Sequence, residues 1–216
     1  ICINCECDLL DEERNICLSC LVKLPLTGFH KQEDNPVIRK FKGRSDLCFA
    51  DAYTYYHRSG IMQKLIHQLK YRANHRIGID LGERYGRVLS SVPDLKDVSH
   101  VIPVPIHKKK EKQRKYNQAA MIAKGISKQL KVSMLDRYLQ KTTRSGSQTK
   151  KDVFERWQNT RSVFQINRKF QALETRHILL VDDVITTGAT LCACVDVIKE
   201  MKDCKVSVAA IAFTAK

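Results

Sequence analysis

Residues 178–190 read ILLVDDVITTGAT, and this stretch decides the predicted fold. Its apolar start predicts a buried strand that carries two acids, Asp182 and Asp183, at its carboxyl end. A loop of small and hydroxyl-bearing residues follows, and we expect a helix from Thr190. A strand that leads through a short loop into a helix is typical of an open α/β sheet.

The same loop has the chemistry of a site for a phosphorylated sugar. Backbone N–H groups at the start of the following helix can bind a phosphate, and Gly188 lets the backbone approach it closely. Asp182 and Asp183 are placed to accept hydrogen bonds from a ribose diol, or to hold Mg²⁺ with the ligand. An ordinary capping acid would explain one aspartate but not both. The predicted phosphate-binding residues are Thr186, Thr187, Gly188, Ala189 and Thr190.

The rest of the chain repeats this alternation of strand and helix. Further strands are predicted at 50–56, 98–104, 132–139 and 206–213, and helices from Ser59, over 77–89 and from Asn117. Such alternation predicts an open, mostly parallel sheet. The longest apolar run has six residues, far fewer than the roughly 20 needed to span a bilayer, and no secretory signal is visible. We therefore expect a cytoplasmic protein without membrane insertion.

The N-terminus differs from the rest in its cysteines. Cys2-Ile-Asn-Cys5 and Cys17-Leu-Ser-Cys20 form two CxxC pairs separated by eleven residues. This spacing predicts a structural Zn²⁺ site of Cys2, Cys5, Cys17 and Cys20, because four thiolates leave no open coordination position. So short a segment buries too small a core to fold without the metal. Cys7 in place of Cys5 is an alternative, and a disulfide framework fits poorly with nine cysteines.

The predicted organisation has three parts: a zinc finger over 1–24, a connector or cap over 25–48, and an α/β domain over 49–216. Positive charge is concentrated in the last of these. Residues 105–176 contain 19 basic and 5 acidic side chains, which is +14 of the formal +15 of the whole chain. A localised basic region attracts nucleic acid or small phosphorylated ligands, although it is also compatible with a solvated surface. The nucleic-acid candidates are Lys108, Lys109, Lys110, Lys112 and Lys115.

Taken together, these motifs resemble the ComF family of competence proteins. The resemblance is carried by the paired CxxC module, Leu69-Lys70-Tyr71, IPVPI at 102–106, Arg114-Lys-Tyr-Asn117-Gln118, and VDDVITTGAT at 181–190, which looks like the motif of type I phosphoribosyltransferases for 5-phosphoribosyl 1-pyrophosphate (PRPP). It implies a type I phosphoribosyltransferase fold, PRPP and Mg²⁺ binding, a zinc finger and a part in DNA uptake. In such enzymes the two acids contact the ribose hydroxyls and the following loop holds the 5′-phosphate.

The function implied by this resemblance has two versions. In the first, the protein transfers phosphoribosyl from PRPP to an acceptor. In the second, the fold is a non-catalytic PRPP sensor, or an adaptor that binds single-stranded DNA beside the helicase of the uptake machinery.

Further residues are candidates for the pyrophosphate side and for a loop that closes over the ligand. Cations would favour a ligand with several clustered negative charges and would stabilise its leaving group. Lys70 also suits a helix C-terminus, and Asn117 or Gln118 would equally well cap the next helix. The pyrophosphate-side candidates are Lys70, Arg114, Asn117 and Gln118, and the loop candidates are Arg144, Gln148 and Arg156.

Two positions depart from the family pattern. Lys115 stands where the family usually has glycine, so a changed turn is expected there. Thr186 stands where purine-specific enzymes carry an aspartate that acts on the base, which argues against purine salvage.

Overall fold

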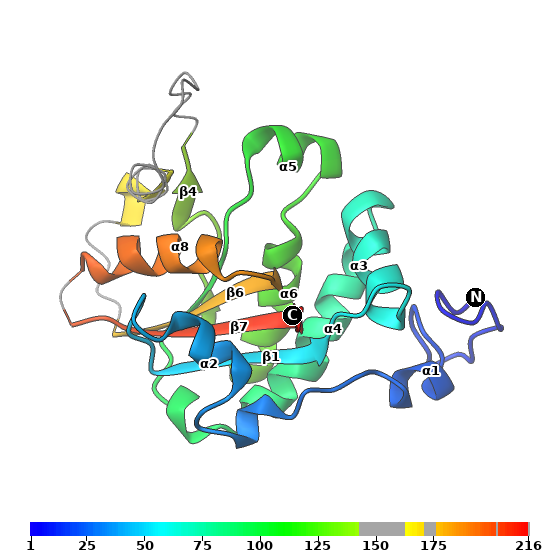
Figure 1. The fold of residues 1–216 in the computed structure, drawn as a ribbon. Coiled ribbons are helices and arrows are strands. Elements are labelled where there is room, and N and C mark those ends of the chain that lie inside the picture. The colour runs from blue at the N-terminus through cyan, green and yellow to red at the C-terminus, as the bar shows by residue number, and fades with distance from the viewer. Residues whose placement is uncertain (143–162, 171–175, 202, 216) are drawn as a thin grey trace, which may run out of the picture.

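The computed structural model describes residues 1–142, 163–170, 176–201 and 203–215. Its centre is a five-stranded sheet in the order β1-β7-β6-β2-β3, parallel throughout (Figure 1). The strands are β1 (Phe49–Tyr55), β2 (His100–Pro103), β3 (Ser133–Met134), β6 (His177–Ile185) and β7 (Lys205–Phe213). The predicted α/β class with an open, mostly parallel sheet is confirmed.

Helices cover both faces of this sheet. The α-helices are α1 (Leu18–Val22), α2 (Pro36–Phe41), α3 (Ile61–Tyr71), α4 (His75–Leu89), α5 (Lys108–Arg114), α6 (Gln118–Leu130) and α8 (Ala189–Lys199), and the 3₁₀ helices are η1 (Phe29–Lys31), η2 (Pro93–Leu95) and η3 (Arg168–Phe170). One core joins α3, α4 and α6 to the side chains of Leu179 and Val181, and the other joins α2 and α8 to Ile178 and Leu180. Both faces of β6 are buried because successive residues of a strand point to opposite faces.

The helices α4 and α6 approach each other more closely than any side chain permits. A Cβ atom on Gly82 would lie 2.2 Å from the Ile122 carbonyl oxygen, and one on Gly125 would lie 2.3 Å from the Ile79 carbonyl oxygen. Glycine at both positions lets the two backbones pack directly against each other, which holds α6 tightly below β2 and β6.

Residues 25–48 are packed against the sheet rather than extended along it. Asn35 caps α2 by accepting hydrogen bonds from the amides of Val37 and Ile38, and its side-chain amide donates to the Ala50 carbonyl in β1. Phe29 and Phe41 are buried in the core on the α8 face. The segment therefore covers the face of the sheet that also carries α8, beside β1.

A short antiparallel hairpin, β4 (Leu139–Lys141) and β5 (Phe164–Ile166), stands apart from the main sheet. The predicted strand over 132–139 is wrong in length, since β3 has only two residues. The chain leaves the sheet because Asp136 and Arg137 turn it into β4, with Arg137 in the left-handed region at φ 61°.

Two predicted helix starts also shift. The cap of α3 is Gly60 rather than Ser59, whose φ of 63° places it in the preceding turn. The helix expected from Thr190 begins at Ala189, with Gly188 as its cap. Among the described residues, no helix combines the length and apolar character that crossing a bilayer requires.

Candidate functional site

Asp182 and Asp183 lie near the carboxyl end of β6, which continues for two further residues to Ile185. Both are partly buried, and their side chains lie on opposite faces of β6 because successive residues of a strand alternate. Asp183 forms an ion pair with Lys70 from the end of α3, with Nζ 2.7 Å from Oδ2. Asp182 is close to Lys141 of β4 and to Cys194 of α8. The two carboxylates thus flank the strand end, where parallel α/β sheets bind ligands.

Burial raises the pKa of Asp182 to about 7, and the neighbouring Asp183 carboxylate adds to this increase. A hydrogen bond from the Asp183 amide and the charges of Lys70 and Lys141 lower the pKa of Asp182 and partly offset it. A carboxyl group in this position releases its proton readily when a cation or hydrogen-bond donor arrives. That behaviour suits a group that accepts hydroxyl groups of a sugar or shares a metal ion.

The loop after β6 opens toward solvent at the start of α8. Thr186 and Thr187 are exposed, Gly188 has a φ of 76°, and no side chain caps the helix. The Thr187 hydroxyl accepts a long hydrogen bond of 3.4 Å from the Ala189 amide. An uncapped N-terminus of an eleven-residue helix, with positive φ at its entrance, is an anion-binding geometry. It lies next to the two aspartates.

The loop after β6 packs against Phe41 and Arg44, which the sequence analysis did not connect with it. A Cβ atom on Gly188 would meet the Phe41 ring at 3.5 Å, and Arg44 donates a 3.1 Å hydrogen bond to the Thr187 carbonyl. Phe41 is the last residue of α2 and Arg44 follows that helix. Both stand more than 140 positions before the loop in the chain, so no local pattern links the two.

Positive charge surrounds the same edge of the sheet. Besides Lys70, the Arg114 guanidinium lies 5.5 Å from the centre of the Tyr71 ring and donates a 2.8 Å hydrogen bond to the Gln118 side chain. Both Lys70 and Tyr71 belong to the last turn of α3, and Arg114 ends α5. In Figure 1, α3 and α5 stand above the edge of the sheet where β6 ends.

Asn117 and Gln118 hold this region together. Asn117 caps α6 by accepting from the Ala119 amide, and it donates to the Val104 carbonyl beyond the end of β2. Gln118 is buried, accepts from Arg114 and donates to the Tyr116 carbonyl. A direct contact of either residue with a ligand stays a prediction.

Lys141 is a site residue that the sequence analysis missed. It lines a cavity of about 560 Å³ between β4 and the segment Pro103–Lys108, together with Asn117. Its side chain is partly buried, and among the described residues it forms no ion pair. The sequence analysis ends its predicted strand at residue 139, whereas the structure places Lys141 in β4, where its charge lowers the pKa of Asp182. The loop candidates Arg144, Gln148 and Arg156 lie outside the described residues.

Lys115 adopts a backbone conformation that glycine takes more easily. It has φ 70° and ψ −9°, in the left-handed region, and follows the last residue of α5. Lysine in this conformation is under local strain. A changed turn relative to the family pattern stays a prediction. The other basic candidates, Lys108, Lys109, Lys110 and Lys112, are carried by α5, which has no buried residue.

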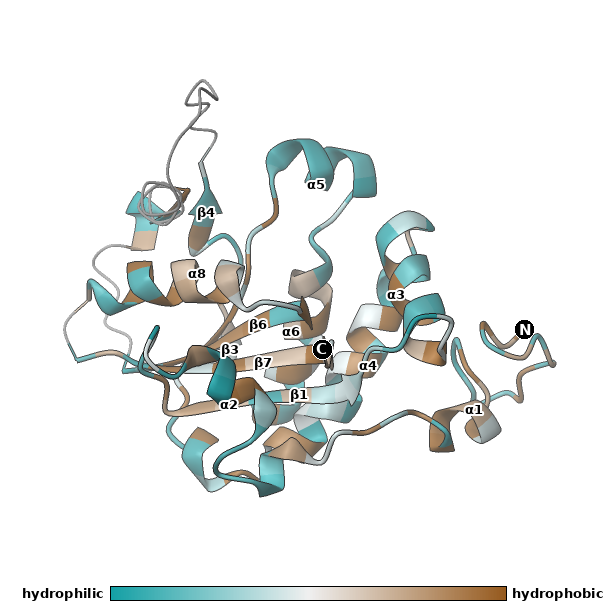
Figure 2. Ribbon diagram, viewed as in Figure 1, coloured by the Kyte–Doolittle hydropathy of each residue, from teal (hydrophilic) through white to brown (hydrophobic). Residues whose placement is uncertain are grey.

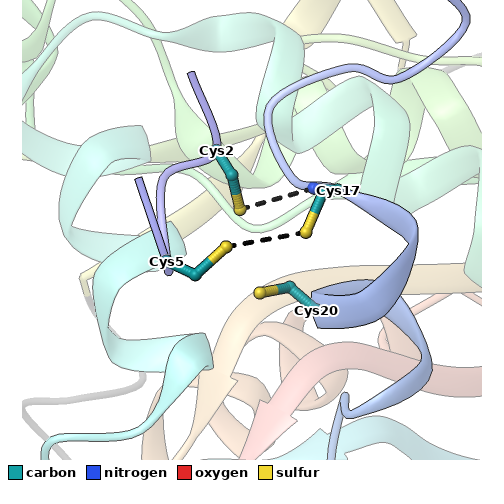
Figure 3. Close-up of side chains that lie close together, drawn as sticks. All are labelled: Cys2, Cys5, Cys17 and Cys20. Carbon is teal, nitrogen blue, oxygen red and sulfur yellow. Dashed lines mark hydrogen bonds between the residues drawn. The ribbon is translucent and has the colours of Figure 1, made fainter. Parts of the chain in front are cut away.

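The four predicted zinc ligands converge (Figure 3). The sulfur atoms of Cys2, Cys5, Cys17 and Cys20 all lie within 4.8 Å of one another. The Cys17 amide donates to the Cys2 sulfur and the Asn4 side chain donates to the Cys20 sulfur, contacts that stabilise thiolates. These four cysteines can therefore hold one metal ion, and four thiolates at this spacing fit zinc. Cys7 lies 3.3 Å from Cys5 but outside the group.

The cysteine module is docked on the α/β domain by polar contacts. The Asn15 side chain donates a 2.6 Å hydrogen bond to Asp80 of α4, and Lys64 of α3 donates to the Asn4 carbonyl. The same helix α3 that supports the module ends at Lys70, beside Asp183.

A Ser–His–Asp arrangement lies at the opposite end of β6, with His177 and Ser207 buried and Asp97 at the surface. His177 contacts Asp97 at 2.6 Å and the Ser207 hydroxyl at 2.8 Å. Ser207 is fully buried, so it cannot reach a substrate, and the network ties β6 to β7 and to the segment before β2.

Comparison with known proteins agrees with this geometry. Residues 117–216 match the phosphoribosyl transferase domain family. The chain is 32% identical to Competence protein F of Haemophilus influenzae over 91 residues, which cover 42% of this chain and 40% of that protein. It is 27% identical to Competence protein ComFC of Bacillus subtilis over 197 residues, 85% of this chain and 77% of that protein. DNA utilization protein YhgH of Escherichia coli K12 is 26% identical over 133 residues, 60% of this chain and 57% of that protein.

The resemblance to the ComF family is thereby confirmed, with a phosphoribosyl transferase domain behind a four-cysteine module. The first of these matches spans two fifths of its relative, whereas the ComFC match spans about three quarters of its relative.

Proposed function

We propose that the protein binds PRPP together with Mg²⁺ at the loop after β6 and takes part in DNA uptake. The observation that carries the proposal is the pair of carboxylates directly before the uncapped N-terminus of α8. Few small ligands combine a vicinal diol with a phosphate at the spacing that such an arrangement accepts, and a ribose 5-phosphate is one of them.

In this proposal different groups at the end of β6 bind the 5′-phosphate, the ribose and the pyrophosphate of PRPP. Amides at the start of α8 and the Thr187 hydroxyl bind the 5′-phosphate, while Asp182 and Asp183 accept hydrogen bonds from the ribose hydroxyls. Arg114 and Lys141 face the pyrophosphate. Mg²⁺ bound with PRPP would supply further neutralisation of its phosphate oxygens, and the two adjacent carboxylates, one with a raised pKa, fit a site that shares a cation.

In this proposal Lys70 links the binding of the ribose to the binding of pyrophosphate. It is held by Asp183 in the ligand-free protein, so a ribose hydroxyl that takes over this carboxylate frees the ammonium group. The freed Lys70 then pairs with the pyrophosphate group. In the catalytic version, pyrophosphate leaves with the electron pair of the C1–oxygen bond, positive charge develops on the ring, and a nucleophilic atom of the acceptor forms the new bond to C1. The carboxylates stabilise that charge electrostatically.

The biological role is proposed from the relatives, whose names refer to competence and DNA utilisation. The helicase of the uptake machinery is the partner that the family resemblance implies.

Titration calorimetry with PRPP and Mg²⁺ tests the binding step. We expect binding to the native protein, and a loss of at least about tenfold in affinity for Asp182→Asn and for Asp183→Asn, because each removes an anionic acceptor. Asp94→Asn, an exposed aspartate on η2, is the matched control and should bind normally. Equal affinity in all four proteins would refute the site.

Release of pyrophosphate distinguishes a transferase from a sensor. If the bound protein releases pyrophosphate with any of a panel of nucleobases, the catalytic version holds. Tight PRPP binding without release across the panel supports the non-catalytic version.

Single-stranded DNA binding is a second candidate function. It is favoured by Tyr71, whose side chain is 60% exposed and carries Arg114 above its ring beside the basic helix α5. Exposed aromatic rings next to a basic surface allow bases to stack while the phosphates are neutralised.

Fluorescence anisotropy with a labelled oligothymidylate tests this function. Affinity should fall steeply as salt rises, and the substitution of Lys108, Lys109, Lys110 and Lys112 by glutamate should weaken binding by at least about tenfold. Tyr71→Ala should weaken binding with little change in the salt dependence. The matched control replaces four exposed lysines outside α5, Lys23, Lys31, Lys96 and Lys131, by glutamate. If α5 and the control give the same loss, this surface is not the DNA site.

A further inference from the structure

The cysteine module carries most of the exposed apolar side chains of the described residues. Large exposed apolar residues are Ile1, Leu10, Leu18, Val22, Leu26 and Tyr71, so that five of six precede residue 27. Three of them, Leu10, Leu18 and Val22, are 74%, 63% and 78% exposed, and we call these three the module surface. Scattered exposed leucines are ordinary, but neighbouring ones mark interaction sites.

The structure brings these three residues into the same part of the module. The Glu13 carboxylate accepts one hydrogen bond from the Leu10 amide at 2.9 Å and another from the Leu18 amide at 2.6 Å. Leu18 and Val22 are four residues apart in α1 and therefore lie on one face of that helix. Figure 2 shows apolar colouring on α1, in contrast to the hydrophilic helix α5.

The surroundings of the module surface are acidic in a protein that is otherwise basic. Residues 1–22 contain five acids and one basic residue, whereas the whole chain has a formal charge of +15. Asp8, Asp11 and Glu12 are exposed, and none forms an ion pair within the described part of the chain. Nucleic acid and anionic lipid are unsuitable occupants, because these carboxylates would repel them.

A second copy of the chain is a poor occupant as well. Its basic helix α5 would satisfy the acids, but every residue of α5 is polar or charged, so the leucines would find no apolar counterpart. The complementary surface needs an apolar centre with a lysine or arginine rim, which is what a basic amphipathic helix presents.

We propose that the module surface is a docking site for a partner protein that presents such a basic amphipathic helix. The three apolar side chains form the centre of the contact, and Asp8, Asp11 and Glu12 select the partner by charge. Three side chains make a small contact, so a transient association is expected. The inference is independent of PRPP binding, which takes place at the end of β6, and the two fail separately.

Selection from a random library of 12-residue peptides displayed on phage tests this site. The full chain with bound zinc serves as bait, and Leu10→Ser/Leu18→Ser/Val22→Ser removes peptides that bind elsewhere. We expect recovered peptides with several apolar residues and a net positive charge. Their affinity, measured by fluorescence anisotropy, should fall at least about tenfold in the triple variant. Leu26→Ser, an exposed leucine outside the module surface, is the control and should bind normally.

A second variant keeps the test valid if the serine variant loses its metal. Asp8→Asn/Asp11→Asn/Glu12→Gln changes exposed residues that ligate nothing, and it should weaken the peptides and remove their salt dependence. Recovery of acidic or uncharged peptides, or of none that prefer the native surface, overturns the proposal. A dimer in sedimentation velocity that the serine variant abolishes would assign the surface to a second copy and overturn it as well.

Discussion

The four-thiol cluster and the twin-aspartate loop are both candidate ligand sites, yet the protein holds them in opposite ways. The cluster gathers four sulfur atoms from a segment of about twenty residues that contributes only a few side chains, such as Ile16 and Leu24, to the core. The aspartates lie in a strand that is hydrogen-bonded on both sides, between two layers of helices. In the four-thiol cluster, the cysteines and their metal would stabilise the fold of the segment. In the twin-aspartate loop, the folded sheet holds two adjacent carboxyl groups whose burial and mutual repulsion destabilise it.

The largest effect should come from breaking the cluster. Cys20→Ser removes one thiolate, and the module loses most of an apparent metal-binding energy of about 10 kcal/mol or more. We expect less than one zinc per chain by metal analysis and rapid proteolysis before residue 25, while the circular dichroism of the sheet and helices persists. Cys7→Ser is the control and should keep its zinc. A Cys20→Ser protein with full zinc, or metal loss in Cys7→Ser instead, would contradict the assigned ligands.

The α/β core, in contrast, should depend on packing alone. Gly82→Ala puts a methyl group against the Ile122 carbonyl and forces α4 and α6 apart, which should lower the free energy of unfolding by about 2–3 kcal/mol. Gly86→Ala, whose methyl group would meet the Gln129 Cβ at 2.8 Å rather than a carbonyl oxygen at 2.2 Å, should cost less. Urea denaturation measures both. Because alanine improves helix propensity at both positions, equal losses in the two variants would show that the contact with the Ile122 carbonyl does not decide the cost.

Asp182→Asn should separate stability from ligand binding. Because the pKa of this carboxyl group is raised in the folded protein, the folded state holds more protons than the unfolded state between about pH 4 and pH 7. The contribution of Asp182 to stability therefore falls as the pH rises through that window. We expect the variant to be more stable than the native protein above pH 7, by roughly 1–2 kcal/mol, and equally stable near pH 4.

Asp182→Asn should also abolish the dependence of PRPP affinity on pH that Asp182 causes. Native affinity should increase from pH 6 to pH 8 as Asp182 loses its proton, whereas the variant should show only the change that the ligand's own phosphates cause. Thermal denaturation and calorimetry over this range measure the two effects. A variant that is less stable at pH 8 would show that the carboxylate supports the fold.

The smallest effect concerns the turn beside the site. Lys115→Gly relieves the left-handed conformation of Lys115 and should raise the free energy of unfolding by about 0.5–1 kcal/mol. Lys112→Gly, inside α5, should lower it by a similar amount, since glycine disfavours a helix interior. In thermal denaturation we expect the melting temperature to rise for Lys115→Gly and to fall for Lys112→Gly. A loss of stability in both variants would show that Lys115 is not strained.

The sequence predicted those parts of the site that are contiguous in the chain. The order of strand, twin acids, threonine loop and helix over 178–190 is local, and a CxxC pair brings its own two ligands together. Both were recognised because a strand and a helix each fix where their neighbouring residues lie.

The remaining residues reach the site only through the tertiary fold. Lys70 meets Asp183 because α3 ends above β6, and Phe41 lies below Gly188 because α2 crosses the edge of the sheet. Lys141 belongs to a three-residue strand, which is too short for any periodicity to reveal. Such contacts depend on sheet order, which a single sequence does not encode locally.

The contact of Arg44 and Phe41 with the loop after β6 has a practical consequence for anyone who trims this protein. The portion that matches the family begins at residue 117, yet two strands and the residues that pack against the loop after β6 come from earlier in the chain. A fragment cut at that boundary would expose an unpaired strand edge and leave Gly188 without its aromatic support. The smallest piece worth expressing for ligand studies therefore starts ahead of Phe29 and keeps everything after it.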